Sequence, residues 1–349
     1  MRLRYLIAWL FLLPLLSAQS AAAPQRAREK RFVVRAVAGV DSKGRQLRRL
    51  SVKNFAVVED GVPQDIVFFK FQDPARPIRQ RTPPAPMSTA PTGTALYNGR
   101  SLLVLYFELS LMSAAEQQRA QTAAREFIET RMAKQDFIAI MAKDGGDPKL
   151  LADFTDDRAT LLSAIRNIPP RPDPAATEEI TDGSYFAQDP DEFAVFNADR
   201  ELAGLETVAD RLASFSQRKS LVCFVTSRDF VFLDRWLADE DQQLIVTIDR
   251  ANGANMTIYP IEVDQPKTAP NTSSSRILSR LAVETGGTVP PDGLSLTAQI
   301  ARAERAYDSY YLIGYWSNYT GHRPRVHQVQ ISLRGAHGTL TFQPSFVVR

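Results

Sequence analysis

The chain has 349 residues, of which 44% are hydrophobic and 23% charged, an ordinary globular composition that excludes global disorder. Lys and Arg number 42 against 39 Asp and Glu. Two of these arginines lie in the leader described next, so the charge gives no indication of a nucleic-acid partner.

The N-terminal segment has the order of a secretory signal peptide. Two arginines precede an apolar run over residues 5–16, and small residues dominate positions 17–23. We expect residues 1–22 to be a signal peptide, cleaved near Ser20 or Ala22, and the protein to be periplasmic or secreted. The alternative is a retained N-terminal anchor. No later segment is long and apolar enough to predict a membrane span.

Residues 31–72 predict a β-rich region. Within them, Glu59-Asp60-Gly61 separates two apolar runs and is typical of a tight turn. Residues 73–98 contain six prolines among Ser, Thr and Arg. They predict an extended linker, because proline removes backbone donors and favours solvated chain.

Between residues 99 and 309, apolar runs alternate with helical patterns, starting with a strand over 102–107. Ser113, followed three residues later by Glu116, predicts a capping box at the next helix. An acidic insertion is expected over 169–199. Further strands are predicted over 137–141, 150–154, 220–225 and 256–263. Further helices are predicted over 158–165, 201–215, 236–250, 275–285 and 296–307. We expect Asp156 or Thr155 to cap the first of these helices. This alternation predicts an α/β fold with a Rossmann-like, doubly wound, mostly parallel sheet.

Cys223 is the single cysteine and lies in an apolar run over 221–225. An exported protein with one cysteine forms no intrachain disulfide, so its core must stabilise it unaided. We expect a buried core thiol rather than a reactive one, because free cysteines are among the most buried residues.

The tail, residues 310–349, is again β-rich. Its first strand carries Tyr310, Tyr311, Tyr315 and Trp316, and we expect it to bury one face, with an exposed aromatic binding patch as the alternative. The runs 327–333 and 339–342 flank a glycine-containing turn and predict a β-hairpin. We expect this hairpin to pack with the N-terminal β-rich region.

Several segments, in the same chain order, resemble the acidobacterial type of the von Willebrand factor A-related family. The first is Asn-Phe-Ala-Val-Val-Glu-Asp-Gly-Val-Pro-Gln over residues 54–64. The others cover residues 218–222, 254–261, 284–287 and 310–315. The resemblance extends over most of residues 31–349. It implies a von Willebrand factor A-like domain with small β-rich flanks.

The resemblance also implies a divalent-ion site for partner binding at the carboxyl edge of the sheet. Its first ligands would come from an Asp-x-Ser-x-Ser loop, whose oxygens suit hard ions such as Mg²⁺. Here Glu108 replaces the Asp, Ser110 matches the first Ser, and Met112 replaces the second. Ser113 is displaced by one position and is better explained as a helix cap.

The second ligand loop departs from the family pattern as well. The Asp expected directly after Thr226 is missing, Arg228 brings a positive charge, and Asp229 is displaced. We therefore expect a degenerate metal-ion-dependent adhesion site without a bound metal. Glu108, Ser110 and Asp229 are weak candidate ligands for Mg²⁺ or another divalent cation.

We expect an exported, non-enzymatic module that binds a protein or cell-surface partner. The candidate binding surface consists of Glu108, Ser110, Ser113, Arg228 and Asp229. Two alternatives stay open, a divalent-metal-dependent adhesion module and a cryptic hydrolase. The sequence contains no H-E-x-x-H, G-x-S-x-G, P-loop or G-x-G-x-x-G motif, so we assign no catalytic residue and expect no enzyme.

Overall fold

The computed structural model describes residues 31–73, 101–170, 190–215, 217–226, 242–264, 274–290, 293–306, 309–319, 321 and 325–348. The expected signal peptide, the proline-rich linker after residue 73 and much of the acidic insertion lie outside these residues. So do Arg228 and Asp229.

A five-stranded sheet forms the centre of the α/β part, in the order β7-β6-β5-β8-β9. The middle strand β5 (Ser101–Glu108) pairs in parallel with β6 (Asp136–Lys143) on one side and β8 (Lys219–Val225) on the other. β9 (Met256–Glu262) continues the parallel sheet, and β7 (Lys149–Thr155) closes the opposite edge in antiparallel orientation.

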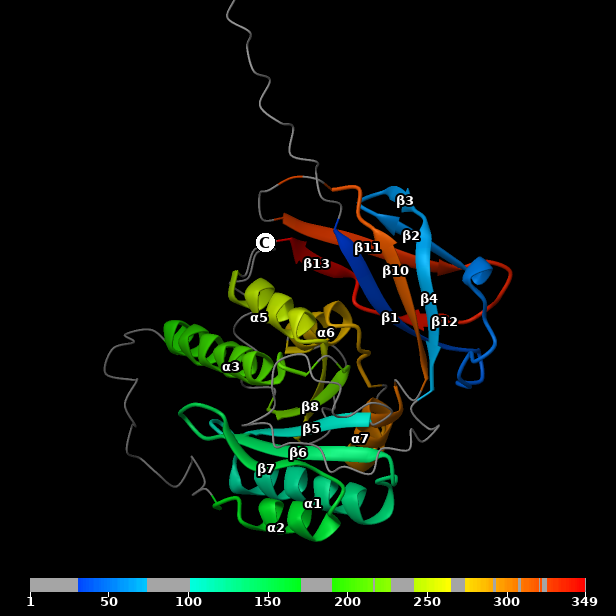
Figure 1. Ribbon diagram of the computed structural model, residues 1–349. Helices are drawn as coiled ribbons and strands as arrows, with labels where there is room; N and C mark the ends of the chain where they lie inside the picture. Colours follow the sequence, from blue (N-terminus) through cyan, green and yellow to red (C-terminus); the bar gives the residue numbers. More distant parts are fainter. Residues whose placement is uncertain are drawn as a thin grey trace, which may run out of the picture.

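Helices cover both faces of this sheet (Figure 1). Alternate β5 side chains point to opposite sides, so Leu102, Val104 and Tyr106 pack against α3, α5 and α6, while the side chains between them pack against α1, α2 and α7. The helices are α1 (Ala114–Thr130), α2 (Arg158–Arg166), α3 (Pro190–Leu212), α5 (Gln242–Gly253), α6 (Ser274–Glu284) and α7 (Leu296–Arg305). Burial on both faces explains the continuous apolar runs of the strands, and the expected doubly wound, mostly parallel fold is confirmed.

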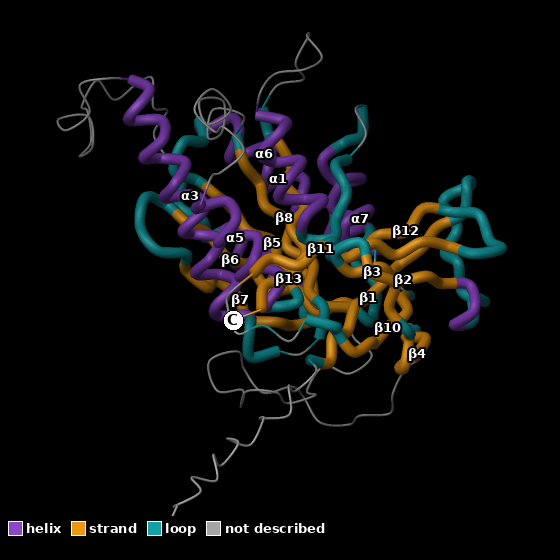
Figure 2. Tube along the Cα trace, turned by 90° about the horizontal axis from the view of Figure 1, so that it is seen from above, coloured by secondary structure: helices purple, strands orange, loops and turns teal. Residues whose placement is uncertain are grey.

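The remaining strands form two four-stranded antiparallel sheets that enclose a second core. One has the order β12-β1-β10-β4 and the other β13-β11-β2-β3. Their bounds are β1 (Phe32–Val40), β2 (Phe55–Glu59), β3 (Val62–Gln64), β4 (Ile66–Gln72), β10 (Tyr310–Trp316), β11 (Arg325–Leu333), β12 (Thr339–Thr341) and β13 (Ser345–Val348), with a 3-10 turn at Val52–Asn54. Figure 2 shows most of these strands at the right of the molecule, away from most of the helices, with β11 and β13 nearer its centre.

This sandwich joins the two ends of the sequence. β1 pairs with β10 and β12, and β2 pairs with β11, which confirms the expected packing of the tail with the N-terminal region. The hairpin prediction was wrong. β11 and β12 belong to different sheets, because the turn after Leu333 carries the chain across the sandwich and β11 pairs with β13 instead.

The cap of α2 and the start of α3 differ from their sequence predictions. Asp157 caps α2, with its carboxylate accepting the amides of Ala159 and Thr160, so the cap lies one residue beyond the expected Asp156. α3 begins at Pro190 and not at Glu201, so its first turns contain the end of the segment expected to be irregular. Proline suits the first turn of a helix, where its missing N–H is not needed.

The burial of individual side chains follows the sequence expectations. Cys223 is buried within the α/β core, as expected. On β10, Tyr311 and Tyr315 are buried in the sandwich core, while Trp316 is 47% exposed. Among the described residues, no helix is long and apolar enough to cross a membrane.

Candidate functional site at the carboxyl edge of the sheet

The candidate site lies where β5 ends, beside the point at which the strand order reverses. Ligands of open α/β sheets bind in this region, outside the carboxyl ends of the strands. Glu108 is the last residue of β5, and the loop after it leads to Ser113, the N-cap of α1. The Ser113 hydroxyl accepts the Glu116 amide, and Glu116 accepts the Ser113 amide, so the predicted capping box is confirmed.

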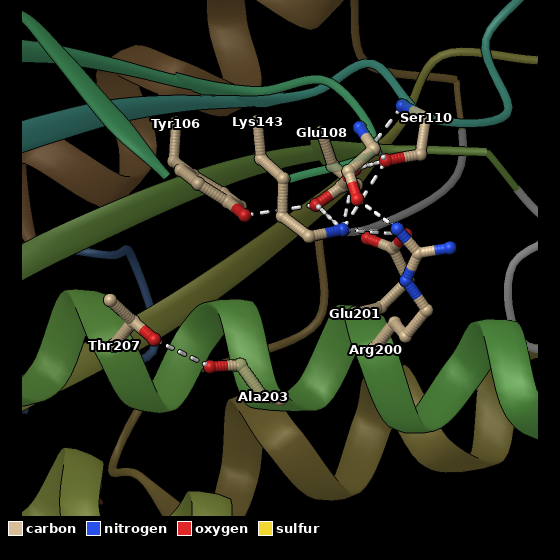
Figure 3. A network of polar contacts seen from close by, with 9 residues as sticks. Tyr106, Glu108, Ser110, Lys143, Arg200, Glu201, Ala203 and Thr207 are labelled. Atoms are coloured by element: carbon tan, nitrogen blue, oxygen red, sulfur yellow. Dashed lines mark hydrogen bonds and ion pairs between the residues drawn. The ribbon is translucent and has the colours of Figure 1, made fainter. Parts of the chain in front are cut away.

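An ammonium group occupies the centre of the site. Lys143, the last residue of β6, places its Nζ 3.2 Å from Oε2 of Glu108 and 3.1 Å from Oε1 of Glu201, which lies on α3 (Figure 3). The Lys143 side chain is 4% exposed, that of Glu108 2% and that of Glu201 4%. One cation is therefore held between two carboxylates inside the protein.

Ser110 connects this buried group to the loop surface. Its hydroxyl donates to Oε1 of Glu108 at 2.5 Å and accepts from Lys143 Nζ at 3.3 Å and from the Gly145 amide at 3.1 Å. The Gly145 carbonyl in turn accepts from the exposed Arg200 guanidinium. The β5 loop, the β6 loop and α3 are thus held together by polar contacts.

The carboxylates of Glu108 and Glu201 stabilise the positive charge of Lys143. Burial alone would lower the pKa of Lys143, but Glu108 and Glu201 outweigh it and raise that pKa above its usual value. Lys143 is therefore protonated at neutral pH. Burial and the neighbouring Glu108 also raise the pKa of Tyr106 well above its usual value, so its hydroxyl keeps the proton that it donates to Glu108 Oε2 at 2.9 Å.

The structure brings together only some of the expected residues. Glu108 and Ser110 share the site, whereas Ser113 is engaged as a helix cap and Met112 is fully buried. Counted as a whole residue, Glu108 is 1% exposed, so it lies beneath the surface and not on it. Arg228 and Asp229 lie outside the described residues.

Sequence reasoning missed Lys143 and Glu201. One sequence feature could have pointed to Lys143. It ends an apolar run that predicts a buried strand, and this strand lies next to the one ending at Glu108. Parallel neighbouring strands end at the same edge of a sheet, so this pattern could have indicated that the two side chains lie close together. Glu201 left no comparable signal, because it is 58 residues from Lys143 in the sequence and its helix was expected to start there.

A hard divalent ion does not fit this arrangement. Its place among the oxygens of Glu108, Ser110 and Glu201 is taken by Lys143 Nζ, which contacts all three residues within 3.3 Å. A cation such as Mg²⁺ demands near-octahedral oxygen ligands, and an ammonium at this position repels it. The contacts of Lys143 hold the loop edge together.

No protein-family model matches the sequence, and no curated protein is significantly similar to it. Among solved structures, an aerotolerance-related membrane protein from Bacteroides fragilis NCTC 9343, with multiple mutations to serines, is 12% identical, covering 59% of this chain and 98% of its own, with a TM-score of 0.37. The vWF domain of the type V pili tip protein Mfa5 from Porphyromonas gingivalis is 14% identical, covering 58% and 94%, with a TM-score of 0.37.

The SpRpn10 VWA domain is 15% identical, covering 58% of this chain and 94% of its own, with a TM-score of 0.34. All three similarities are distant and concern the fold alone. They agree with the α/β class that the sheet order defines, and they carry no argument about metal, partner or reaction.

Proposed function

We propose that this chain is an exported, non-enzymatic interaction module that binds a protein or cell-surface partner through the carboxyl edge of its α/β sheet, without a bound metal. The observation that supports the proposal is the buried ammonium of Lys143 between Glu108 and Glu201. A covalently attached cation offsets one of the two negative charges and is always present, so the edge should keep its shape at any divalent-ion concentration.

The partner would contact the rim above this cluster and not the buried carboxylate. Ser110 is partly exposed, and Asp144 and Arg200 are exposed beside it. Arg228 and Asp229, which follow β8 in the sequence, belong to the surface expected from the sequence but lie outside the described residues. A rim with both signs of charge favours a partner with complementary charges, because rim charges set association rate and register more than raw affinity.

The hydrolase alternative has one specific observation in its favour, the 3.3 Å separation of Ser110 Oγ and Lys143 Nζ. A lysine can activate a serine only as a neutral amine that takes up its proton. The two neighbouring carboxylates raise the pKa of Lys143, so the amine is not available as a base at neutral pH. We therefore favour binding over catalysis.

Assignment to the acidobacterial type of the von Willebrand factor A-related family is also a proposal. Its support is the placement of the family-like segment over residues 54–64, which folds as β2, a tight turn and β3. Export rests on the leader over residues 1–22. N-terminal sequencing of chain recovered from periplasm or medium would test the expected cleavage near Ser20 or Ala22.

The metal-free reading is tested by thermal melts of the mature protein in EDTA, Mg²⁺, Mn²⁺ or Ca²⁺, with Glu108→Ala as the comparison. We expect Mg²⁺ and Ca²⁺ to leave the melting temperature unchanged. An ion at a hundred times its Kd would add about 2.7 kcal/mol and raise the midpoint by several degrees. A rise with Mg²⁺ that is lost in Glu108→Ala would establish metal-dependent adhesion instead.

The binding surface is tested by charge reversal on the rim. Asp144→Arg and Arg200→Glu should weaken retention of a partner captured from the native cell surface or medium, whereas Lys53→Glu, an exposed change on the sandwich, should not. Equal retention by all three variants would place the binding surface elsewhere on the molecule.

A further inference from the structure

A second cluster of charged side chains lies at one end of the β-sandwich, in the part joined from both chain termini. Glu59 ends β2, Asp60 starts the turn to β3, and His327 lies on β11. One ligand atom from each of the three lies within 4.8 Å of the other two. Neither the proposed binding edge nor the α/β core contributes to this cluster.

The turn geometry brings two consecutive carboxylates to the same place. Neighbouring side chains in a strand point to opposite faces, so Glu59 and Asp60 would ordinarily diverge. Asp60 has a φ of 48° and Gly61 a φ of 82°, the two positive values of a type I′ turn. The Asp60 amide donates to the Gln328 carbonyl and its Oδ1 accepts the Gln328 amide, each at 2.9 Å, which fixes Oδ2 toward His327.

The imidazole faces both carboxylates through one nitrogen. His327 Nδ1 lies 2.8 Å from Asp60 Oδ2 and 3.2 Å from Glu59 Oε1. The rings of Tyr319 and Phe346 lie 4.5 Å and 5.1 Å from the imidazole and fix its plane. The Ser317 hydroxyl donates to Glu59 Oε1 at 2.6 Å and orients that carboxylate.

Two of the three residues are buried, whereas Asp60 is exposed and its Oδ2 also lies 3.4 Å from the Arg325 guanidinium. The side chain of His327 is 1% exposed and that of Glu59 is 3% exposed. Within the described part of the chain, Glu59 Oε2 makes no hydrogen bond of good geometry, and the buried Tyr315 hydroxyl is the group that interacts with this carboxylate. An unsatisfied carboxylate oxygen in a buried position is costly, and a bound cation is one way to remove that cost.

We propose that Glu59, Asp60 and His327 form a binding site for a transition-metal ion of the zinc type. One imidazole nitrogen and two carboxylate oxygens are ligands that Zn²⁺ accepts. Mg²⁺ and Ca²⁺ prefer all-oxygen shells and suit the site less well. The hydrogen bonds from Ser317 and Gln328 hold the carboxylates as outer-shell partners do in metal sites.

Such an ion would crosslink segments from the N-terminal and C-terminal parts of the chain. Asp60 and His327 are 267 residues apart, and the ion would tie the β2–β3 turn to β11. Clips that close long loops give the largest entropic stabilisation in theory. The chain has one cysteine and therefore no intrachain disulfide, so this site would perform the stapling role in an exported protein.

The test is calorimetric titration of ZnCl₂ into the mature full-length protein after removal of metals with a chelator. We expect one zinc ion per chain and a melting temperature several degrees higher with zinc. Asp60→Asn should weaken zinc binding at least tenfold, since it removes one charged ligand while asparagine tolerates positive φ and keeps an oxygen for the Gln328 amide. His327→Gln should abolish stoichiometric binding.

Asp41→Asn is the matched control, because Asp41 also accepts backbone amides in an exposed turn but belongs to no such cluster. It should bind zinc as the unchanged protein does. A proton on His327 Nδ1 would satisfy the same distances without an ion. Absence of stoichiometric zinc binding, or equal affinity in folded Asp60→Asn, would therefore overturn the proposal and leave a hydrogen-bonded cluster without a metal.

Discussion

At the scale of single residues, two buried lysines have opposite electrostatic surroundings. Lys143 is surrounded by two carboxylates that more than compensate its burial. Lys219, at the start of β8, is fully buried and donates to the Phe215 carbonyl at 2.6 Å. Its burial, with a smaller effect from Arg218, lowers its pKa to about 7. The two residues therefore contribute to stability in opposite directions.

Replacing Lys143 by Met should destabilise the protein by about 3–5 kcal/mol, because it leaves two buried carboxylates without their cation. Urea unfolding of Lys143→Met at neutral pH measures this loss. Lys149→Met, an exposed change on the neighbouring strand, should stay within about 0.5 kcal/mol of the unchanged protein. A Lys143→Met variant as stable as this control would show that the ion pairs contribute little.

Lys219→Met should stabilise the protein at pH 7, and its advantage should shrink as the pH rises toward 10. The pKa of Lys219 is about 7 in the folded state and near its ordinary 10.5 when unfolded, so between these values the unfolded state binds more protons. Stability of the unchanged protein therefore rises with pH across this window, by at most about 5 kcal/mol. Parallel unfolding curves of both proteins from pH 6 to 10 test this, and a pH-independent difference would contradict it.

At the scale of secondary-structure elements, local sequence signals act mainly at helix and strand ends. The capping box of Ser113 and Glu116 starts α1 directly after the candidate site. The same serine therefore fixes where the site loop ends and the helix begins. Asp60 and Gly61 act similarly in the sandwich, where their positive φ values set the register of β2 against β3.

Ser113→Ala should cost about 1 kcal/mol, because the first turn of α1 loses the acceptor for the Glu116 amide. Chemical denaturation measures the loss. Ser163→Ala, inside α2 and away from any cap, should be neutral or slightly stabilising, since alanine has the higher helix propensity. A loss in Ser163→Ala as large as that in Ser113→Ala would argue against capping as the cause.

At the scale of the whole molecule, the sandwich depends on strands contributed from both ends of the chain. β2 is hydrogen-bonded to β3 on one side and to β11 on the other. Its buried residues Phe55 and Val57 share a core with Val329 and Ile331 of β11. The N-terminal β-rich segment is thus half of a unit that the C-terminal strands complete.

A chain ending at residue 324 should lose amide protection throughout β2, because its partner strand and half of its core are gone. Hydrogen exchange followed by mass spectrometry detects this. A chain ending at residue 344 lacks β13 but keeps β11, and β2 should stay protected in it. Undiminished protection of β2 in the shorter chain would mean that the N-terminal segment folds without the tail.

Sequence patterns alone predicted the order of strands and helices in the α/β part, the cap at Ser113, the turn at Asp60 and Gly61, and the burial of Cys223. These features follow from the periodicity of hydrophobic residues, from helix-capping residues and from turn-forming residues. Each of these signals acts over a few neighbouring residues. The same signals placed Glu108 and Ser110 at a strand end. They did not reveal that Glu108 would be covered.

The surroundings of these residues depend on the three-dimensional fold. Lys143 reaches Glu108 across 35 residues of sequence, Glu201 reaches Lys143 across 58, and His327 reaches Asp60 across 267. The tail strands likewise separated into two sheets although their local pattern was that of a hairpin. Such contacts depend on strand register and on how packed layers meet. The burial of apolar faces over the whole chain sets both, and no short stretch of sequence contains that information.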